Sequence, residues 1–137
     1  MIMQPSVLMV CACAVAALST PSQAADAVRW ATANELTWES VAQPAGARQA
    51  LLWGDPKAGE SAVLMSWKFN SKLPEQVRNQ DVHFIVMAGT FTVETGGIHR
   101  EFGPGAAITI PKNTKHNLGC EAAGECRVLM HYPGPSK

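Results

Sequence analysis

Apolar and polar residues alternate along much of the chain, and this period of two is typical of β-strands with one buried face. The clearest example covers residues 63–70, where one face of the expected strand carries Val63, Met65, Trp67 and Phe69. An apolar stripe at helical spacing persists nowhere for long. The pattern therefore predicts an all-β fold.

Glycine and proline residues divide the rest of the chain into further short strands. These strands are expected at residues 36–41, 49–53, 82–87, 90–95, 98–102, 106–110 and 127–132. Gly96-Gly97 supplies a two-residue turn between two of them, and Pro111 ends another. Many short strands with frequent turns predict a sandwich or a small barrel.

The first 25 residues differ from the rest because they contain no charged side chain. An apolar run at 7–18 is shorter than the about 20 residues that a membrane span needs, and Pro21 and Ser22-Gln23-Ala24 follow it. This pattern predicts a signal peptide over residues 1–25, although no Lys or Arg precedes the run. An uncleaved anchor and a cytosolic protein with an apolar tail are the alternatives.

Residues 26–137 would then form one domain, periplasmic or secreted, with no stable membrane span after cleavage. The chain has 11 Lys and Arg residues and 11 Asp and Glu residues, so its formal net charge is zero. A neutral chain gives a polyanion no electrostatic attraction, so we expect no nucleic-acid partner.

Removal of the leader would take Cys11 and Cys13 with it and leave two cysteines, Cys120 and Cys126. Ala123-Gly124 between them is typical of a hairpin tip, and residues that flank such a short loop can lie at bridging distance. Because disulfides persist in exported proteins, we expect these two cysteines to form one. Two free thiols are the alternative.

Residues 105–116 resemble the second conserved motif of the cupin superfamily. Gly105, Pro111 and His116 stand at the motif's Gly, Pro and His positions, and Asn113 replaces its inner glycine. Asn is the residue besides glycine that best tolerates a positive φ, so the turn can survive this exchange. The first cupin motif consists of Gly, His, His, Glu and Gly. At the same spacing this chain has, in that order, Asn70, Gln76, Arg78, Val82 and Gly89.

This resemblance extends from about Trp53 to Pro133. It implies a cupin-type double-stranded β-helix, or jelly-roll barrel, with a small-molecule cavity between its sheets. Dimerisation is common among cupins, so the resemblance also allows a homodimer. It does not imply one function, because cupins include both enzymes and non-enzymatic binders.

In metal-binding cupins three His and one Glu hold the ion, and here only His116 matches a ligand position. The other positions hold Gln76, Arg78 and Val82, of which Gln is a weak ligand and the other two cannot coordinate. We therefore expect no metal and no other cofactor; if there is one, it would be a divalent transition metal. Asp81, His83 and His116 are the fallback ligand set, which requires a β-bulge because odd positions of this strand should point outward.

A cavity with Arg78, Gln76 and His116 suits a small polar or anionic ligand, because a guanidinium can form a forked pair with a carboxylate or phosphate. His131, on the last strand, is a further ligand-binding candidate, with a place in the core as the alternative. We expect binding without catalysis. The alternatives are a metal-free isomerase-like or epimerase-like enzyme that uses His116 to move a proton, and a metal-dependent cupin oxygenase with an unusual ligand set.

Two simpler interpretations remain open for the exposed charges. Arg78 could pair with Glu75 or Asp81 near the mouth of the barrel, and His99, in the glycine hairpin, is expected to be solvent-exposed.

Overall fold

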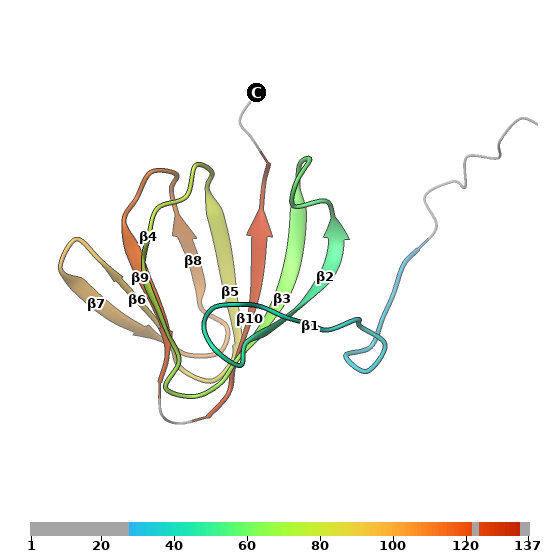
Figure 1. The fold of residues 1–137 in the computed structure, drawn as a ribbon, viewed down its shortest axis with the longest axis horizontal. Coiled ribbons are helices and arrows are strands. Elements are labelled where there is room, and N and C mark those ends of the chain that lie inside the picture. Colours follow the sequence, from blue (N-terminus) through green and yellow to red (C-terminus); the bar gives the residue numbers. More distant parts are fainter. Residues whose placement is uncertain (1–27, 122–123, 135–137) are drawn as a thin grey trace, which may run out of the picture. The chain divides into compact units, whose positions relative to one another are not determined.

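The computed structural model describes residues 28–121 and 124–134. These residues form ten β-strands in two antiparallel sheets, which confirms the predicted all-β class (Figure 1). The predicted signal peptide at residues 1–25 and Ala123 of the predicted hairpin tip lie outside the described residues. Within the described part, no helix has the length and apolar character needed to cross a membrane.

The chain passes repeatedly from one sheet to the other. The larger sheet contains, in spatial order, β1 (Glu39–Ser40), β2 (Arg48–Gly54), β3 (Ser61–Trp67), β10 (Cys126–Tyr132), β5 (Val82–Ala88) and β8 (Ala107–Ile110). The smaller sheet contains β4 (Lys72–Gln76), β9 (His116–Cys120), β6 (Phe91–Thr95) and β7 (Ile98–Phe102). Figure 1 labels the strands of each sheet.

One hydrophobic core joins the inner faces of the two sheets. Trp67 and Phe84 of the larger sheet pack against Phe91 of the smaller one, with ring centres 5.4 and 5.7 Å apart. Alternate residues of β5 and β10 enter this core, namely Val82, Phe84, Val86, Val128 and Met130. The period of two seen in the sequence therefore separates inward from outward side chains along these strands.

Most predicted strands are present, but two predictions need correction and two strands were missed. The strand expected at 36–41 is shorter, because only Glu39–Ser40 pairs with β2. Phe69 was expected on the buried face of β3, yet β3 ends at Trp67 and Phe69 is 60% exposed. Asn70 follows in a turn with a φ of 58°, which takes Phe69 out of the sheet. The sequence pattern also gave no sign of β4 or β9.

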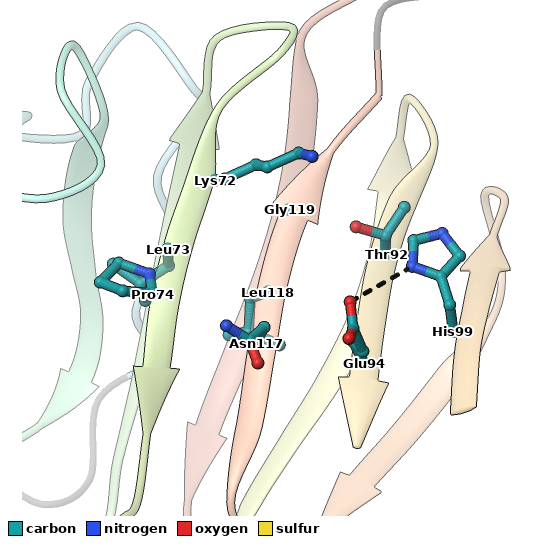
Figure 2. Close-up of a pocket in the computed structure, with 9 residues that line it drawn as sticks. All are labelled: Lys72, Leu73, Pro74, Thr92, Glu94, His99, Asn117, Leu118 and Gly119. Carbon is teal, nitrogen blue, oxygen red and sulfur yellow. Dashed lines mark ion pairs between the residues drawn. The ribbon is translucent and has the colours of Figure 1, made fainter. Parts of the chain in front are cut away.

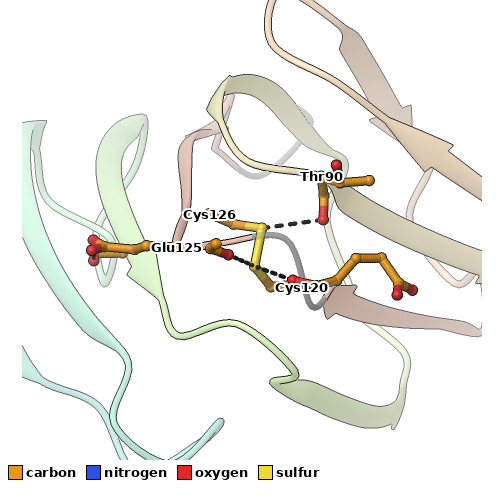
Figure 3. Close-up of a disulfide and its surroundings, with 7 residues drawn as sticks. Thr90, Cys120, Glu125 and Cys126 are labelled. Carbon is orange, nitrogen blue, oxygen red and sulfur yellow. Dashed lines mark hydrogen bonds between the residues drawn. A yellow bond between two sulfur atoms is a disulfide. The ribbon is translucent and has the colours of Figure 1, made fainter.

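The predicted disulfide between Cys120 and Cys126 is present and joins the end of β9 to the start of β10 (Figure 3). It therefore links the two sheets. The Cys126 sulfur lies 3.2 Å from the carbonyl oxygen of Thr90, in the crossing from β5 to β6. Gly89, in the same crossing, has a φ of +78°, and a Cβ there would lie 2.6 Å from the Glu125 carbonyl oxygen.

Candidate ligand-binding site

Gln76 and His116 are directly opposite each other on the paired strands β4 and β9. His116 is 1% exposed, and its Nδ1 lies 2.8 Å from the carbonyl oxygen of Thr114. A carbonyl can only accept, so Nδ1 carries a proton, and in the neutral form of the ring Nε2 has a free lone pair. Among the described residues neither His116 Nε2 nor Gln76 Nε2 has a hydrogen-bond partner, although both atoms are buried.

Arg78 follows β4 and is held by the loop that carries the second motif. Its carbonyl oxygen accepts a 2.7 Å hydrogen bond from the backbone N–H of Asn113. Asn113 has a φ of 61°, so it does adopt the conformation for which the family uses glycine. The sequence prediction that this turn survives the exchange is confirmed.

The Arg78 side chain turns toward the last strand instead of pairing with a carboxylate. Its Cζ lies 5.5 Å from the centre of the Tyr132 ring, and its Nε is buried with no hydrogen-bond partner in the described part of the chain. No ion pair joins Arg78 to Glu75 or Asp81 within the described residues, since Asp81 accepts from the backbone N–H of Lys112 instead. The Nε–H donor of the guanidinium is therefore buried without a hydrogen-bond acceptor among the described residues.

Arg78 and Tyr132 line a cavity of about 220 Å³. Its other lining residues are Gln49, Pro56, Val63, Met65 and Gln80. Burial raises the pKa of the Tyr132 phenol, and the nearby Arg78 charge partly opposes that rise. The cavity therefore combines a fixed cation, a protonated phenol and amide groups over an apolar floor.

Tyr132 was missed at the level of sequence, although a signal was present. It shares its parity on β10 with Val128 and Met130, which both enter the core. The same rule would have placed His131 on the opposite face. Applying this alternation from Val128 and Met130 would have placed Tyr132 on the inner face of the last strand and His131 on the outer face.

His131 lies on the outer face of the larger sheet and is not brought together with Gln76, Arg78 and His116. Its ring stacks on that of His83 at 5.7 Å, and its Nε2 lies 2.9 Å from the Glu60 carboxylate. His83 Nδ1 in turn lies 2.9 Å from the Thr109 hydroxyl. The fallback metal set is likewise not assembled, because His83 faces outward whereas His116 is buried inside.

The interior residues do not fit the metal that many cupins hold. Val82, at the position of the family's glutamate, is fully buried in the hydrophobic core and has no atom that coordinates. Arg78 keeps its positive charge at any working pH, which opposes a cation beside it. Only His116 offers a good ligand atom, so these positions cannot form the family's ligand set.

A second hollow, of about 380 Å³, lies on the outer face of the smaller sheet (Figure 2). It exists because Gly119 has no side chain above the sheet; a Cβ there would lie 2.6 Å from the Thr92 hydroxyl oxygen. Lys72 borders one side, and Glu94 and His99 border the other. His99 is exposed, as the sequence predicted.

Comparison with known proteins agrees with this architecture. A family model described as the ChrR Cupin-like domain matches residues 26–135. Comparison with curated proteins found no match.

Several solved structures resemble the chain. The polyketide cyclase RemF from Streptomyces resistomycificus has a TM-score of 0.69 and 20% identity, over 80% of this chain and 83% of that one. KdgF from Halomonas sp. has a TM-score of 0.63 and 22% identity, over 74% and 92%. An RmlC-like cupin from Shewanella frigidimarina has a TM-score of 0.64 and 15% identity, over 78% and 92%. At these identities the likeness shows the fold alone, and it confirms the predicted jelly-roll barrel.

Proposed function

Because the chain belongs to the ChrR cupin-like family, we propose that it binds a small polar or anionic ligand inside its barrel, with no metal at the family's usual position. The observation that carries the proposal is Arg78, whose buried Nε lacks a partner among the described residues beside a cavity of about 220 Å³. A buried donor left unpaired costs about 1–3 kcal/mol, and more when it is charged. A carboxylate or phosphate oxygen would remove that cost.

The chemistry of the other cavity residues supports an anion over a cation. The Tyr132 phenol, with its raised pKa, stays protonated near neutral pH and can donate a hydrogen bond. Gln49 and Gln80 offer amide N–H groups, and Val63 and Met65 provide an apolar wall. This combination suits a small organic acid better than a bare inorganic ion, because the apolar wall needs a hydrocarbon part to cover it.

Gln76 and His116 lie opposite each other on β4 and β9, and Gln76 is two residues before Arg78 in the chain. They do not line the cavity that holds Arg78 and Tyr132. Their unpartnered buried atoms add an amide donor and a lone pair for a longer ligand. We therefore assign Arg78 and Tyr132 as the anchor of the site and Gln76 and His116 as its extension.

Metal-free proton transfer by His116 is the second candidate. It is favoured by the Thr114 carbonyl, which fixes the proton on Nδ1 and leaves Nε2 as a base. A positioned imidazole of this kind could take a proton from a bound carbon acid. This candidate requires turnover that His116→Gln abolishes while the ligand still binds, whereas simple binding requires no turnover.

Export to the periplasm or outside the cell is part of the proposal. The leader-like pattern at residues 1–25 supports it, and so does the Cys120–Cys126 disulfide, because such bonds persist in oxidising compartments.

The binding proposal is tested by thermal unfolding of the full chain with acetate, malonate, benzoate or phosphate, against chloride. An anion at ten times its Kd should stabilise the wild type by about 1.4 kcal/mol, which for a domain of this size is a Tm rise of about 5 °C. Arg78→Gln should lose this rise. Arg100→Gln is the matched control, because its guanidinium lies over Phe102 on an exposed strand and not in the cavity.

Two results would contradict the proposal. One is that none of the organic acids raises the wild-type Tm above the chloride value. The other is that Arg78→Gln and the wild type respond equally to the same acid.

A further inference from the structure

We propose a zinc site on the outer face of the smaller sheet, formed by His99, Glu101 and Glu121. One ligand atom from each of these residues lies within 4.8 Å of those of the other two. His99 and Glu101 are exposed and Glu121 is half-buried, so an ion can reach them from solvent. The site is separate from the interior of the barrel and does not depend on the function proposed for it.

Strand register explains why these three residues meet. His99 and Glu101 are two positions apart on β7, so their side chains share a face. Glu121 follows β9, and its backbone N–H donates a 2.9 Å hydrogen bond to the Thr90 carbonyl oxygen just before β6. Strand β6 lies between β7 and β9, and the long glutamate side chains reach over it.

The donor set suits a borderline transition ion. Imidazole and carboxylate both bind Zn²⁺, whereas Mg²⁺ and Ca²⁺ prefer oxygen ligands alone. Zinc-bound nitrogen and oxygen atoms lie about 2.0–2.2 Å from the ion, so only about 1 Å of movement by surface side chains would close the site. Two carboxylates this close repel each other, and a divalent ion would turn that repulsion into attraction.

Glu94 places a further negative charge beside His99. Its carboxylate lies 3.9 Å from His99 Nδ1 and directly across from His99 in the β6–β7 pair. Figure 2 shows this carboxylate on one side of the imidazole ring, with the second ring nitrogen on the far side. The distance of 3.9 Å is too long for a hydrogen bond, so Glu94 would act on a bound ion through its negative charge alone.

Three protein ligands leave one position of a tetrahedral ion open. His99 also borders the hollow above Gly119, so the open position would be reached from that hollow. Lys72 stands at the opposite border, separated from β7 by β9 and β6. Its positive charge would favour an anion at the open position and does not crowd the ion itself.

The test is calorimetric titration of Zn²⁺ into the untagged full chain, with Cys11 and Cys13 replaced by alanine because thiolates bind zinc. We expect one equivalent to bind. His99→Ala and Glu121→Gln should each weaken binding by about 100-fold, and Glu94→Gln by a smaller factor, because it removes only a nearby negative charge. Binding of Co²⁺ should give the visible absorption of a four- or five-coordinate ion, and His99→Ala should remove it.

His83→Ala is the matched control, because its imidazole belongs to the larger sheet and should leave zinc affinity unchanged. The site is contradicted if His99→Ala binds zinc as tightly as the parent chain, or if Ca²⁺ competes on equal terms with Zn²⁺. Arg78→Gln should bind zinc normally, and His99→Ala should keep its thermal response to organic acids. Failure of this proposal is therefore distinct from failure of the interior site.

Discussion

The guanidinium carbon of Arg78 lies 5.5 Å from the centre of the Tyr132 ring, and the cation and the phenol line the same cavity. Burial raises the pKa of Tyr132, and the Arg78 charge lowers it by a smaller amount. The charge of Arg78 therefore affects the titration of Tyr132, so a change at Arg78 should change the pKa of the phenol.

Replacing Arg78 should change the titration of Tyr132. Without the cation, Arg78→Gln should raise the phenol's pKa further above the ordinary value of 10.0. Tyr132 is the only tyrosine in the chain, so the tyrosinate absorbance of the folded protein measures it without interference. Arg100→Gln should leave the titration unchanged, and a lowered pKa in Arg78→Gln would contradict the assignment.

Burial of Tyr132 predicts how stability depends on pH in alkali. The folded state holds the phenol proton more tightly than the unfolded chain, so the free energy of unfolding should fall as the pH rises above 10.0. Tyr132→Phe should remove this contribution to the pH dependence. Urea unfolding of the two proteins across this range checks the prediction, and parallel curves would show that Tyr132 is not responsible.

Loss of the disulfide should weaken the fold without abolishing it. The Cys120–Cys126 bond closes a short loop with a sequence separation of 6, and a loop of that length contributes about 2 kcal/mol in the chain-entropy account. The Cys120→Ala/Cys126→Ala chain should therefore unfold at a lower urea concentration than the wild type. Cys11→Ala/Cys13→Ala is the control, and an equal loss in both chains would assign the effect to something other than the bond.

Two glycines with positive φ should respond differently to alanine. Gly89 and Gly96 have φ values of +78° and +55°, but only at Gly89 would a Cβ meet backbone atoms, whereas at Gly96 it meets open space. Gly96→Ala should cost about 1–2 kcal/mol from backbone strain alone. Gly89→Ala should cost at least about 1 kcal/mol more, because the added atom also overpacks the crossing beside Cys126. Equal losses in urea unfolding would contradict this difference.

Replacing His131 should not affect ligand binding inside the barrel. It stacks on His83 and contacts Glu60 on the outer face, so His131→Ala should keep the Tm rise produced by organic acids. If His131→Ala folds normally but loses that rise, His131 contributes to the interior site and its assignment to the outer face is contradicted.

The sequence predicted the elements whose two faces differ in polarity. Strand β5 was found because its apolar run ends at glycine, and the β6–β7 hairpin because Gly96-Gly97 separates two β-rich runs. Strand β4 was missed because it is an edge strand that contains Pro74 and exposed charges. Strand β9 was missed because it is short, contains Asn117 and Gly119, and shows little alternation in burial.

The candidate site was predictable only where motif spacing fixed it. That spacing assigned Gln76 and His116 to one cavity, and the structure pairs them across β4 and β9; Asn113 kept the turn that holds Arg78. It said nothing of Tyr132, because the phenol comes from a strand outside both motifs. The zinc cluster was also invisible, since His99 and Glu121 are separated in sequence and meet only through the order of β9, β6 and β7.

The imidazole nitrogen spectrum of the ¹⁵N-labelled full chain tests the interior site most directly, since the protein has only four histidines. We predict that His116 carries its proton on Nδ1, and that the organic acid which raises the Tm most also shifts the His116 Nε2 signal. Arg78→Gln should show the same free spectrum and no shift. The account is contradicted if the His116 signal does not shift when the acid is added. It is also contradicted if the signal shifts equally in Arg78→Gln, because the anion site is built on Arg78 and extended by His116.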